Sequence, residues 1–598
     1  LGSSALNANT TASDNTAIGQ AALTTNTTGA RNTAVGRNAL NQNSTAHRNT
    51  AVGYNGLYTN STGTYNTSVG DSGLYANTTG SYNIAVGNNA LTSNTTASEN
   101  TSVGVESLEA NTTGQQNCAF GFRTLEANTT ADHNTAFGHQ SLKTNTTGTQ
   151  NTAVGADALF ANTTANNNTA VGFAALEDNT TGAQNTAVGM GALKNNTTAA
   201  YNVAVGYLAL EDNTTGTRNT AVGTFALEFN TDSNNTAVGY QAMGSNTTGD
   251  SCTAVGEQAL DANTTGDNNT AIGRDACGQQ TTASNNTAVG CNALYTNTAG
   301  SNTAVGAQAL YYNTTGTENV AVGDDALKDN TTANYNTGVG HGAGESLTTG
   351  ASNTIMGARA GDAITTGGSN TIIGQGAASV GSNMDDNCIM GVSAAYNGNS
   401  VHFNKNVALG NRSMYHIVDA KESVAIGYEA LFTDCGDENV AVGHKCGKYN
   451  TSIRFTGYGS YAGLNNQSWP NMFMGYNAAG GGAAITGSYN TAVGYEAAYA
   501  LTTGSENTAF GDNALKDIST GAKNTAIGRN ALDDLTTGSF NTAVGWNSMS
   551  NGTVTGTENC ALGQETLRDV TTGSRNTAIG RSAGEQLTTG ENNSFIGR

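Results

Sequence analysis

The sequence repeats itself every 17 residues over nearly its whole length of 598 residues. The segment Asn15–Gly19 reads Asn-Thr-Ala-Ile-Gly, and near copies of it begin at Asn32 and Asn49 and recur as far as Asn593. About 35 copies fill the chain, with the consensus N-T-A-V-G-x-x-A-L-x-x-N-T-T-G-x-x, whose positions we number 1 to 17. A fixed period of this length is typical of solenoids, in which each repeat stacks on the next.

The period slips at a few places: it is 16 residues from Asn219 to Asn235 and 18 residues from Asn541 to Asn559. Such slips fit the corners of a coil, where insertions and deletions are tolerated. Both ends of the sequence fall inside a repeat. We therefore expect the repeats to continue in a longer chain, or through end-to-end contact with another copy.

The repeat favours β-structure over helix. Position 5 is Gly, position 15 is usually Gly, and Asn-Thr-Thr stands between them. Gly costs about 1 kcal/mol at a helical site, and Asn and Thr are poor helix formers. We therefore predict an all-β fold, a tandem 17-residue-repeat parallel β-solenoid (β-roll). Its corners would lie at the Gly of position 5 and at Asn-Thr-Thr-Gly, where Asn and Gly tolerate positive φ.

Side chains alternate along a strand, so Thr and Val of the motif point to one side and Asn and Ala to the other. We expect Val at position 4 and Leu at position 9 to point inward and stack into a thin core. The Ala at position 3 would then form a flat outer stripe, over which two backbones could approach closely. That stripe suggests a parallel homotrimer, with a single-chain solenoid as the alternative.

Composition excludes several functions. The chain has 23 Lys and Arg against 44 Asp and Glu, a net charge of -21, which disfavours nucleic-acid binding. It contains no apolar run of about 18 residues, so we expect no membrane insertion within this segment. The eight Cys show no paired spacing. Cys118, Cys388 and Cys560 stand at position 2, and we expect them to be small buried residues.

Three zones follow one another: residues 1–340 are regular with Asn at position 12, residues 341–489 are irregular, and residues 490–598 are regular with an apolar residue at position 12, such as Leu501 or Ile518. An apolar residue at a corner should turn inward and thicken the core. We therefore expect the last zone to be the best packed and the middle zone to carry protruding loops, where function often resides.

The Asn-Thr-Thr corner has two interpretations. It matches the N-glycosylation acceptor pattern, and it also suits a ladder of Asn amides that hydrogen-bond from coil to coil. The residues concerned are Asn26, Asn43, Asn60, Asn77, Asn94 and Asn128.

Tyr recurs at position 6, where an exposed ring could bind sugars or proteins or could simply cover the corner. These residues are Tyr54, Tyr207, Tyr240, Tyr428, Tyr476 and Tyr495. Regular Thr arrays also suggest ice binding. The inward direction expected for Thr at position 2 argues against it.

No pattern predicts chemistry, so we expect no enzyme, cofactor or metal. The middle zone contains scattered His and Cys at spacings unlike those of zinc sites, and Gly340–Gly344 lacks the Lys of a phosphate loop and is interpreted as a turn. The scattered residues are His402, His416, His444, Cys435 and Cys446.

The motif Ser423–Gly427, Ser-Val-Ala-Ile-Gly, and with it every N-T-A-V-G copy, resembles the head repeat of YadA-type trimeric autotransporter adhesins. That resemblance implies a left-handed, trimeric parallel β-roll that attaches bacteria to host matrix or to one another. Similar arrays also occur in phage tail-fibre proteins. We therefore expect a structural or adhesive extracellular fibre segment at a cell surface or on a virion. The alternatives are a phage tail fibre and an ice- or carbohydrate-binding module. The receptor is not predicted.

Overall fold

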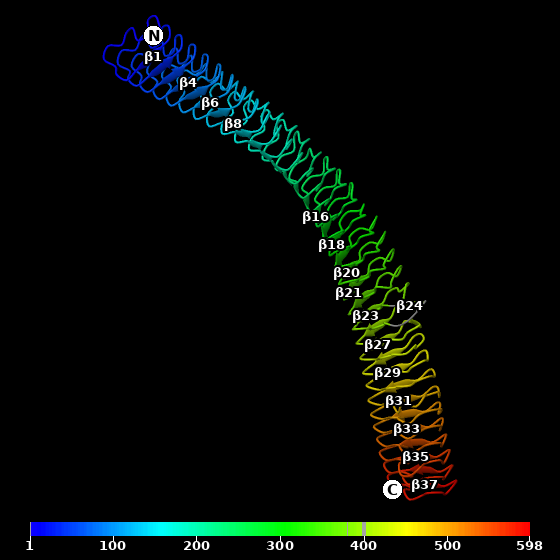
Figure 1. The fold of residues 1–598 in the computed structure, drawn as a ribbon. Coiled ribbons are helices and arrows are strands. Elements are labelled where there is room, and N and C mark those ends of the chain that lie inside the picture. Colours follow the sequence, from blue (N-terminus) through cyan, green and yellow to red (C-terminus); the bar gives the residue numbers. More distant parts are fainter. Residues whose placement is uncertain (1, 380, 397–401) are drawn as a thin grey trace. The chain divides into compact units, whose positions relative to one another are not determined.

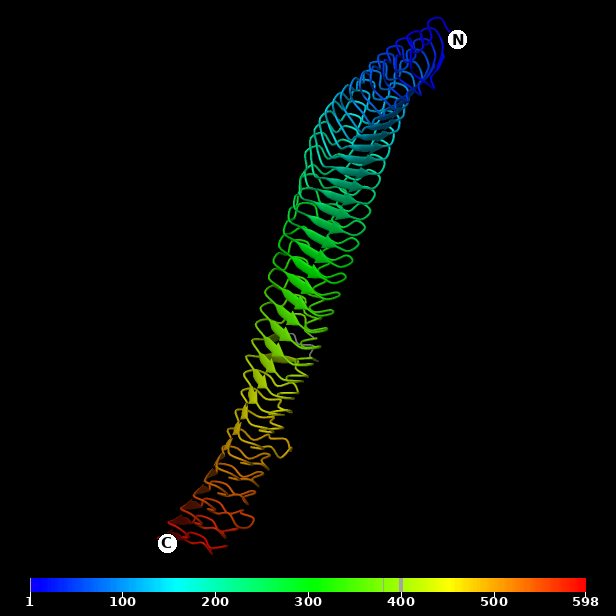
Figure 2. The ribbon, with the colours of Figure 1, turned by 90° about the vertical axis from the view of Figure 1, so that its left-hand side faces the viewer.

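The computed structural model describes residues 2–379, 381–396 and 402–598. All described elements are three-residue strands, and the described residues contain no helix that could cross a membrane. The chain divides into two units, Leu1–Gly300 and Ser301–Arg598. Within each unit the strands are stacked in sequence order as a parallel sheet (Figures 1 and 2). This confirms the predicted all-β parallel solenoid.

The first unit contains one strand in each coil. Its strands are β1 (Thr16–Ile18), β2 (Thr33–Val35), β3 (Thr50–Val52), β4 (Thr67–Val69), β5 (Ile84–Val86), β6 (Thr101–Val103), β7 (Cys118–Phe120), β8 (Thr135–Phe137), β9 (Thr152–Val154), β10 (Thr169–Val171), β11 (Thr186–Val188), β12 (Val203–Val205), β13 (Thr220–Val222), β14 (Thr236–Val238), β15 (Thr253–Val255), β16 (Thr270–Ile272) and β17 (Thr287–Val289).

The second unit continues the same pattern. Its strands are β18 (Thr303–Val305), β19 (Val320–Val322), β20 (Thr337–Val339), β21 (Thr354–Met356), β22 (Thr371–Ile373), β23 (Cys388–Met390), β24 (His402–Asn404), β25 (Val407–Leu409), β26 (Asp419–Lys421), β27 (Val424–Ile426), β28 (Val440–Val442), β29 (Thr456–Tyr458), β30 (Met472–Met474), β31 (Thr491–Val493), β32 (Thr508–Phe510), β33 (Thr525–Ile527), β34 (Thr542–Val544), β35 (Cys560–Leu562), β36 (Thr577–Ile579) and β37 (Ser594–Ile596).

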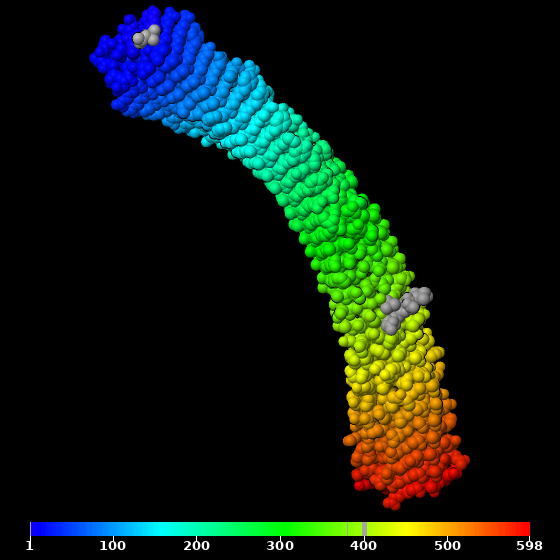
Figure 3. Space-filling view, in the orientation of Figure 1, coloured from blue at the N-terminus to red at the C-terminus, as the bar shows by residue number. Residues whose placement is uncertain are grey.

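Neighbouring coils are held in strict register. Thr152 pairs with Thr169, and Val154 pairs with Val171, so each residue lies beside its equivalent 17 positions later. Parallel strands are about 4.8 Å apart, so the 17 strands of the first unit extend about 80 Å. Each coil contacts only its neighbours along the chain, and the sequence colours therefore run in bands in the space-filling view (Figure 3).

The Gly at position 5 is required by two features of the backbone. In Gly172 the φ angle is +137°, and a Cβ there would lie 2.4 Å from the carbonyl oxygen of Gly189 in the next coil. Residues with a positive φ, in the left-handed region, also occur at positions 7, 9 and 17, including Leu176 with a φ of 53°. The expected positive φ at positions 12 and 15 is wrong. The backbone takes positive φ angles at positions 5, 7, 9 and 17 instead.

The expected direction of the strand side chains is also wrong. In β10, Ala170 is fully buried, whereas Val171 is 37% exposed and Thr169 is half-buried. The Ala of position 3 therefore points inward, while Thr and Val of positions 2 and 4 point outward. The physical reason is volume, because the Leu of position 9, such as the fully buried Leu176, occupies the interior opposite the strand.

Exceptions to the Ala at position 3 show how little interior volume there is. The second unit has Ile355 at this position, and the position-9 residues of that coil and the preceding one are Gly361 and Gly344 instead of Leu. A Cβ on Gly344 would lie 2.9 Å from Ile355 Cδ1, and one on Gly361 would lie 3.3 Å from it. A larger residue on the strand thus requires a smaller one opposite, as close packing demands.

The apolar residues at position 12 turn inward, as predicted. They include Leu347, Ile364, Leu501, Ile518, Leu535 and Val570, each at most 1% exposed. Leu587, in the last coil, is an exception and is half-buried. The zone boundaries at residues 340 and 489, and the better packing of the last zone, stay predictions.

The irregular middle zone adds one small feature to the coil. Strands β24 and β26 pair in parallel as a separate two-stranded sheet beside the main one. The coil between Asn387 and Asn406 has 19 residues. A second coil of 19 residues lies between Asn471 and Asn490. The protruding loops expected in this zone stay a prediction, and residues 397–401 lie outside the described residues.

Candidate functional site

Within each unit the strands present a continuous surface, which we call the outer face. It consists of the side chains at positions 2 and 4 of the 35 strands that share the coil pattern, β24 and β26 being excluded. None of these outward positions holds Asp, Glu, Lys, Arg or His. The 44 acidic and 23 basic residues of the chain all lie elsewhere.

The apolar part of the outer face is accessible along each unit. Val154, Val171 and Val188 are 38%, 37% and 36% exposed, and they lie side by side because the strands are in register. Monomeric proteins rarely expose an apolar patch larger than a few hundred Å². A row of this kind that extends over a whole unit is a candidate interaction surface. Sequence analysis missed it because the strand was assigned the opposite phase.

The predicted Asn residues lie inside the coil. Asn26, Asn43, Asn60, Asn77, Asn94 and Asn128 are fully buried. Each Nδ2 donates to the Oδ1 of the equivalent Asn one coil earlier, at 2.7–3.0 Å. Of the two interpretations of the Asn-Thr-Thr corner, the structure contains the ladder; glycosylation stays a prediction.

A second amide ladder follows position 1. The backbone N–H of Asn168 donates to Asn151 Oδ1 at 3.0 Å, and Asn168 Nδ2 donates to the carbonyl of Gly182 at 2.9 Å. The backbone of Asn168 thus contacts the preceding repeat, and its side chain contacts Gly182 near the end of its own repeat. Buried polar groups are tolerated only when they are hydrogen-bonded, and these two ladders satisfy the amides along most of the described chain.

The predicted Tyr residues are exposed at the corner, at 39–50%. Tyr476 and Tyr495 stack at 5.6 Å between ring centroids, while Tyr207 and Tyr240 each contact Phe225 edge to face. Tyr54 lies alone among the six, with the Arg37 guanidinium 5.8 Å from its ring.

His444 and Tyr461 extend the corner aromatics into a row. Rings of Tyr428, His444, Tyr461, Tyr476 and Tyr495 follow one another over five consecutive coils, 5.1–6.1 Å apart. In the two stacked pairs, Tyr428 with His444 and Tyr476 with Tyr495, one face of each ring is covered by the other ring. Such a row suits a corner cover better than a stack of sugar rings.

The second unit contains a polar cleft of about 710 Å³. Arg359, Asp362, Gln375 and the rings of Tyr396 and Tyr415 are among its walls. The cleft lies where position 9 has become Gly or Ala, so a smaller residue replaces the usual Leu. Ser379 Oγ donates to the Arg359 carbonyl at 3.0 Å, and burial raises the pKa of Asp362.

Two groups of side chains among the described residues have donors that could hold a cation. Glu106, Glu109 and Glu126 form the first, and there Arg123 Nε lies 2.5 Å from Glu106 Oε2.

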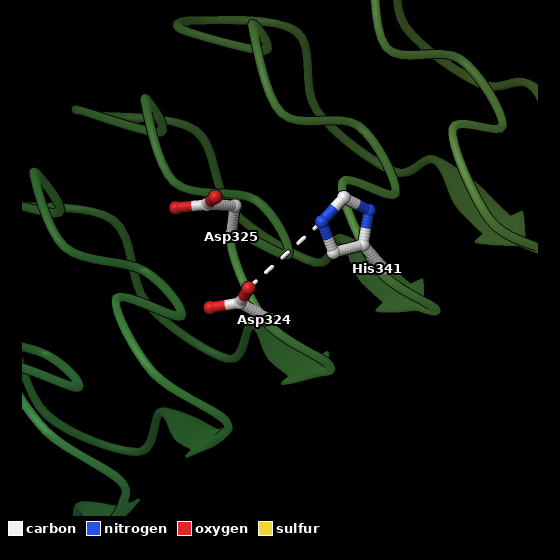
Figure 4. A group of neighbouring side chains, drawn as sticks. All are labelled: Asp324, Asp325 and His341. Carbon is white, nitrogen blue, oxygen red and sulfur yellow. Dashed lines mark ion pairs between the residues drawn. The ribbon is translucent and has the colours of Figure 1, made fainter.

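The second group lies on two neighbouring coils of the second unit. Asp324 Oδ2 lies 3.8 Å from His341 Nε2 on the next coil, and Asp325 is close to both (Figure 4). Lys328 Nζ is 2.9 Å from Asp325 Oδ1 and already compensates that charge. The geometry is that of surface ion pairs. The neighbouring Gly340, Gly342 and Gly344 form a turn, as predicted.

The Cys and His residues of the middle zone take separate structural roles. Cys435 and Cys446 are buried, which raises the pKa of both thiols. His416 packs edge-on against Tyr415 at 4.6 Å, and the side chain of His402 lies outside the described part of the chain.

The expectation that the Cys residues at position 2 are buried is wrong. Cys118, Cys388 and Cys560 are half-buried, because position 2 belongs to the outer face.

No protein-family model matches the sequence, and no curated protein matches it. The fold therefore defines the chain by class alone, as a parallel β-solenoid repeat protein with 17-residue coils.

Proposed function

We propose that the chain is a segment of an extracellular fibre, at a cell surface or on a virion, and that copies of it associate through their outer faces. The role is structural and adhesive and requires no catalysis. The observation that carries the proposal is the absence of charged side chains from the outward positions of all 35 strands. A solvated face of an acidic protein of this length would be expected to carry charge.

A second copy of the chain is the partner that fits this surface best. The rows of Thr and Val repeat at the strand spacing, about 4.8 Å, so only a partner with the same spacing can match them over a whole unit. Interface cores are depleted of charge and rich in apolar groups, as is the outer face. The resemblance to trimeric adhesin heads supports three parallel copies. The contact would use Thr and Val rather than the Ala stripe.

Attachment would use the surfaces that association leaves free. The corner aromatics and the polar cleft are such surfaces, and repeated weak contacts along a fibre add up through multivalency. A receptor that contacts the corner side chains would meet corners repeatedly along the fibre.

Sedimentation of paired variants tests the association. Val171→Glu with Val188→Glu places two charges on the outer face, and we expect it to convert assemblies into single chains with an unchanged β-type circular dichroism spectrum. The matched control is Phe173→Glu, on the corner of the same coil and 55% exposed, which should leave assembly intact. A wild-type chain that sediments as a single chain would refute the proposal.

Ice binding is a second candidate, favoured by one observation. Thr at position 2 points outward from the sheet, as Thr169 does in β10, so the argument against ice binding from an inward Thr does not hold. Uncharged, regularly spaced rows are what an ordered water layer could match. Measurable thermal hysteresis by the purified chain would support this function, and its absence at high concentration would exclude it.

A further inference from the structure

The outer rows alone cannot fix how associated copies align along their length. From β9 to β17 the outer face repeats Thr or Val at position 2 and Val or Ile at position 4. A partner that slides by one coil, about 4.8 Å, meets the same kinds of residue again. Register is weakly specified wherever a strand surface is uniform.

Eight Met, Phe and Tyr side chains, all longer than Val or Ile, interrupt this uniformity, and we call them the landmark residues. They are Phe120, Phe137, Met356, Met390, Tyr458, Met472, Met474 and Phe510.

The landmark residues are accessible. Phe510, Tyr458 and Met390 are 55%, 41% and 40% exposed. Phe120 and Phe137 stack on each other at 4.7 Å between ring centroids, in neighbouring strands of the first unit. All eight lie on the outer face, so their size has no role in the core of the coil.

We propose that the landmark residues set the register in which copies of the chain align. In the second unit they stand on β21, β23, β29, β30 and β32, an irregular series. No shift by whole coils superimposes more than two of these five strands on one another. Only the unshifted alignment places every large side chain against its own equivalent, whereas shifted copies oppose large residues to Val and leave gaps or clashes.

This inference rests on the proposed self-association, which supplies the second copy as partner. It assigns different roles to two sets of residues on the outer face. The Thr and Val rows provide contact area over many coils, and the landmark residues select one register among many otherwise equal ones. A single distinctive residue specifies register in other repetitive assemblies by the same logic.

Photo-cross-linking at a uniform part of the face tests the register directly. A p-benzoylphenylalanine at Val222, in β13, reacts with whatever partner strand lies opposite, and mass spectrometry identifies that strand. The test variant replaces Met472 with Thr and the other seven landmark residues with Val, which are the consensus residues. We expect it to assemble still, as judged by sedimentation.

The matched control replaces eight corner aromatics with Asn and leaves the outer face unchanged. These are Phe122, Phe173, Tyr207, Tyr240, Tyr428, Tyr476, Tyr495 and Trp546.

In the wild type and in the control, cross-links should go to one strand of the partner. In the test variant they should spread to the flanking strands, so that the share at the main strand falls about threefold, because shifts of one coil in either direction become equally favourable. A single cross-linked strand in an assembled test variant would overturn the proposal. So would loss of assembly in that variant alone, since the landmark residues would then provide the contact itself. A wild-type chain that sediments alone and gives no interchain product would refute the self-association and with it this inference.

Discussion

The buried Asn ladder allows a quantitative prediction for the Asn77→Ala variant. Asn77 Nδ2 donates to Asn60 Oδ1 at 2.7 Å and to the carbonyl of Gly80 at 3.0 Å, while its Oδ1 accepts from Asn94 Nδ2 at 2.8 Å. The substitution removes all three bonds and leaves partner groups without water. With about 1 kcal/mol for each bond and a further desolvation penalty, we expect the free energy of local opening to fall by about 4 kcal/mol.

Amide hydrogen exchange measured by mass spectrometry tests this expectation, because it reports local opening in a repeat array. A loss of about 4 kcal/mol corresponds to roughly a thousandfold faster exchange in the coils around Asn77, at about 1.4 kcal/mol for each factor of ten. The matched control is Thr79→Ala, on the same corner with its side chain exposed. The reasoning is refuted if Asn77→Ala speeds exchange less than tenfold, or if the control has an equal effect.

Three further predictions follow from the coil. Gly172→Ala would place a Cβ 2.4 Å from the carbonyl oxygen of Gly189, so we expect local loss of β-structure and fast amide exchange there; a native exchange pattern would contradict this. Ile518→Asn puts one amide in an apolar stack without Asn neighbours, and the unpaired polar group should lower the chain's melting temperature by a local cost of about 2 kcal/mol, whereas Ile518→Val should change it little. Burial, with Asp534 nearby, raises the pKa of Asp533 to about 7 from 3.8. The folded carboxyl therefore keeps its proton to a higher pH than the unfolded one, so the contribution of Asp533 to stability is fully present below pH 3.8 and is lost as pH rises through about 7. Asp533→Asn should remove that fall in exchange measurements at pH 4 and pH 8, and an unchanged fall would show that another group titrates.

The backbone of the solenoid could be predicted from the sequence because its constraints recur in every coil. A Gly at position 5, such as Gly172, allows a φ that other residues avoid and leaves room for the next coil. Asn-Thr-Thr and Gly exclude a stable helix. These restrictions fix a parallel stack of 17-residue coils without reference to any distant contact.

Which side chains of the strand face the interior could not be predicted, because the alternation of side chains is compatible with either orientation of the strand. Thr-Ala-Val can bury Ala or bury Thr and Val, and hydrophobicity favours the second choice. Volume decides for the first, since Leu176 already fills the space opposite Ala170. The sequence did contain a signal for the correct orientation. In the repeat with Ile355 at position 3, position 9 holds Gly361 in place of the usual Leu, so a larger residue on the strand goes with a smaller one opposite.

The Asn residues show a similar limit of sequence reasoning. The pattern around Asn77 is compatible with a glycan acceptor at an exposed corner and with a buried amide ladder. Only the coil geometry decides, because the distance of 2.7 Å to Asn60 Oδ1 depends on the stacking of successive coils. The same stacking explains why an apolar residue can replace the Asn in the second unit, provided that its neighbours are apolar too.

A cross-section of the native assembly by cryo-electron microscopy tests the central claim most directly. We predict two or more coils around a shared axis, with the strands carrying Val171 and its equivalents turned toward that axis and the corners turned outward. A single coil whose Thr and Val rows face only solvent would contradict the account.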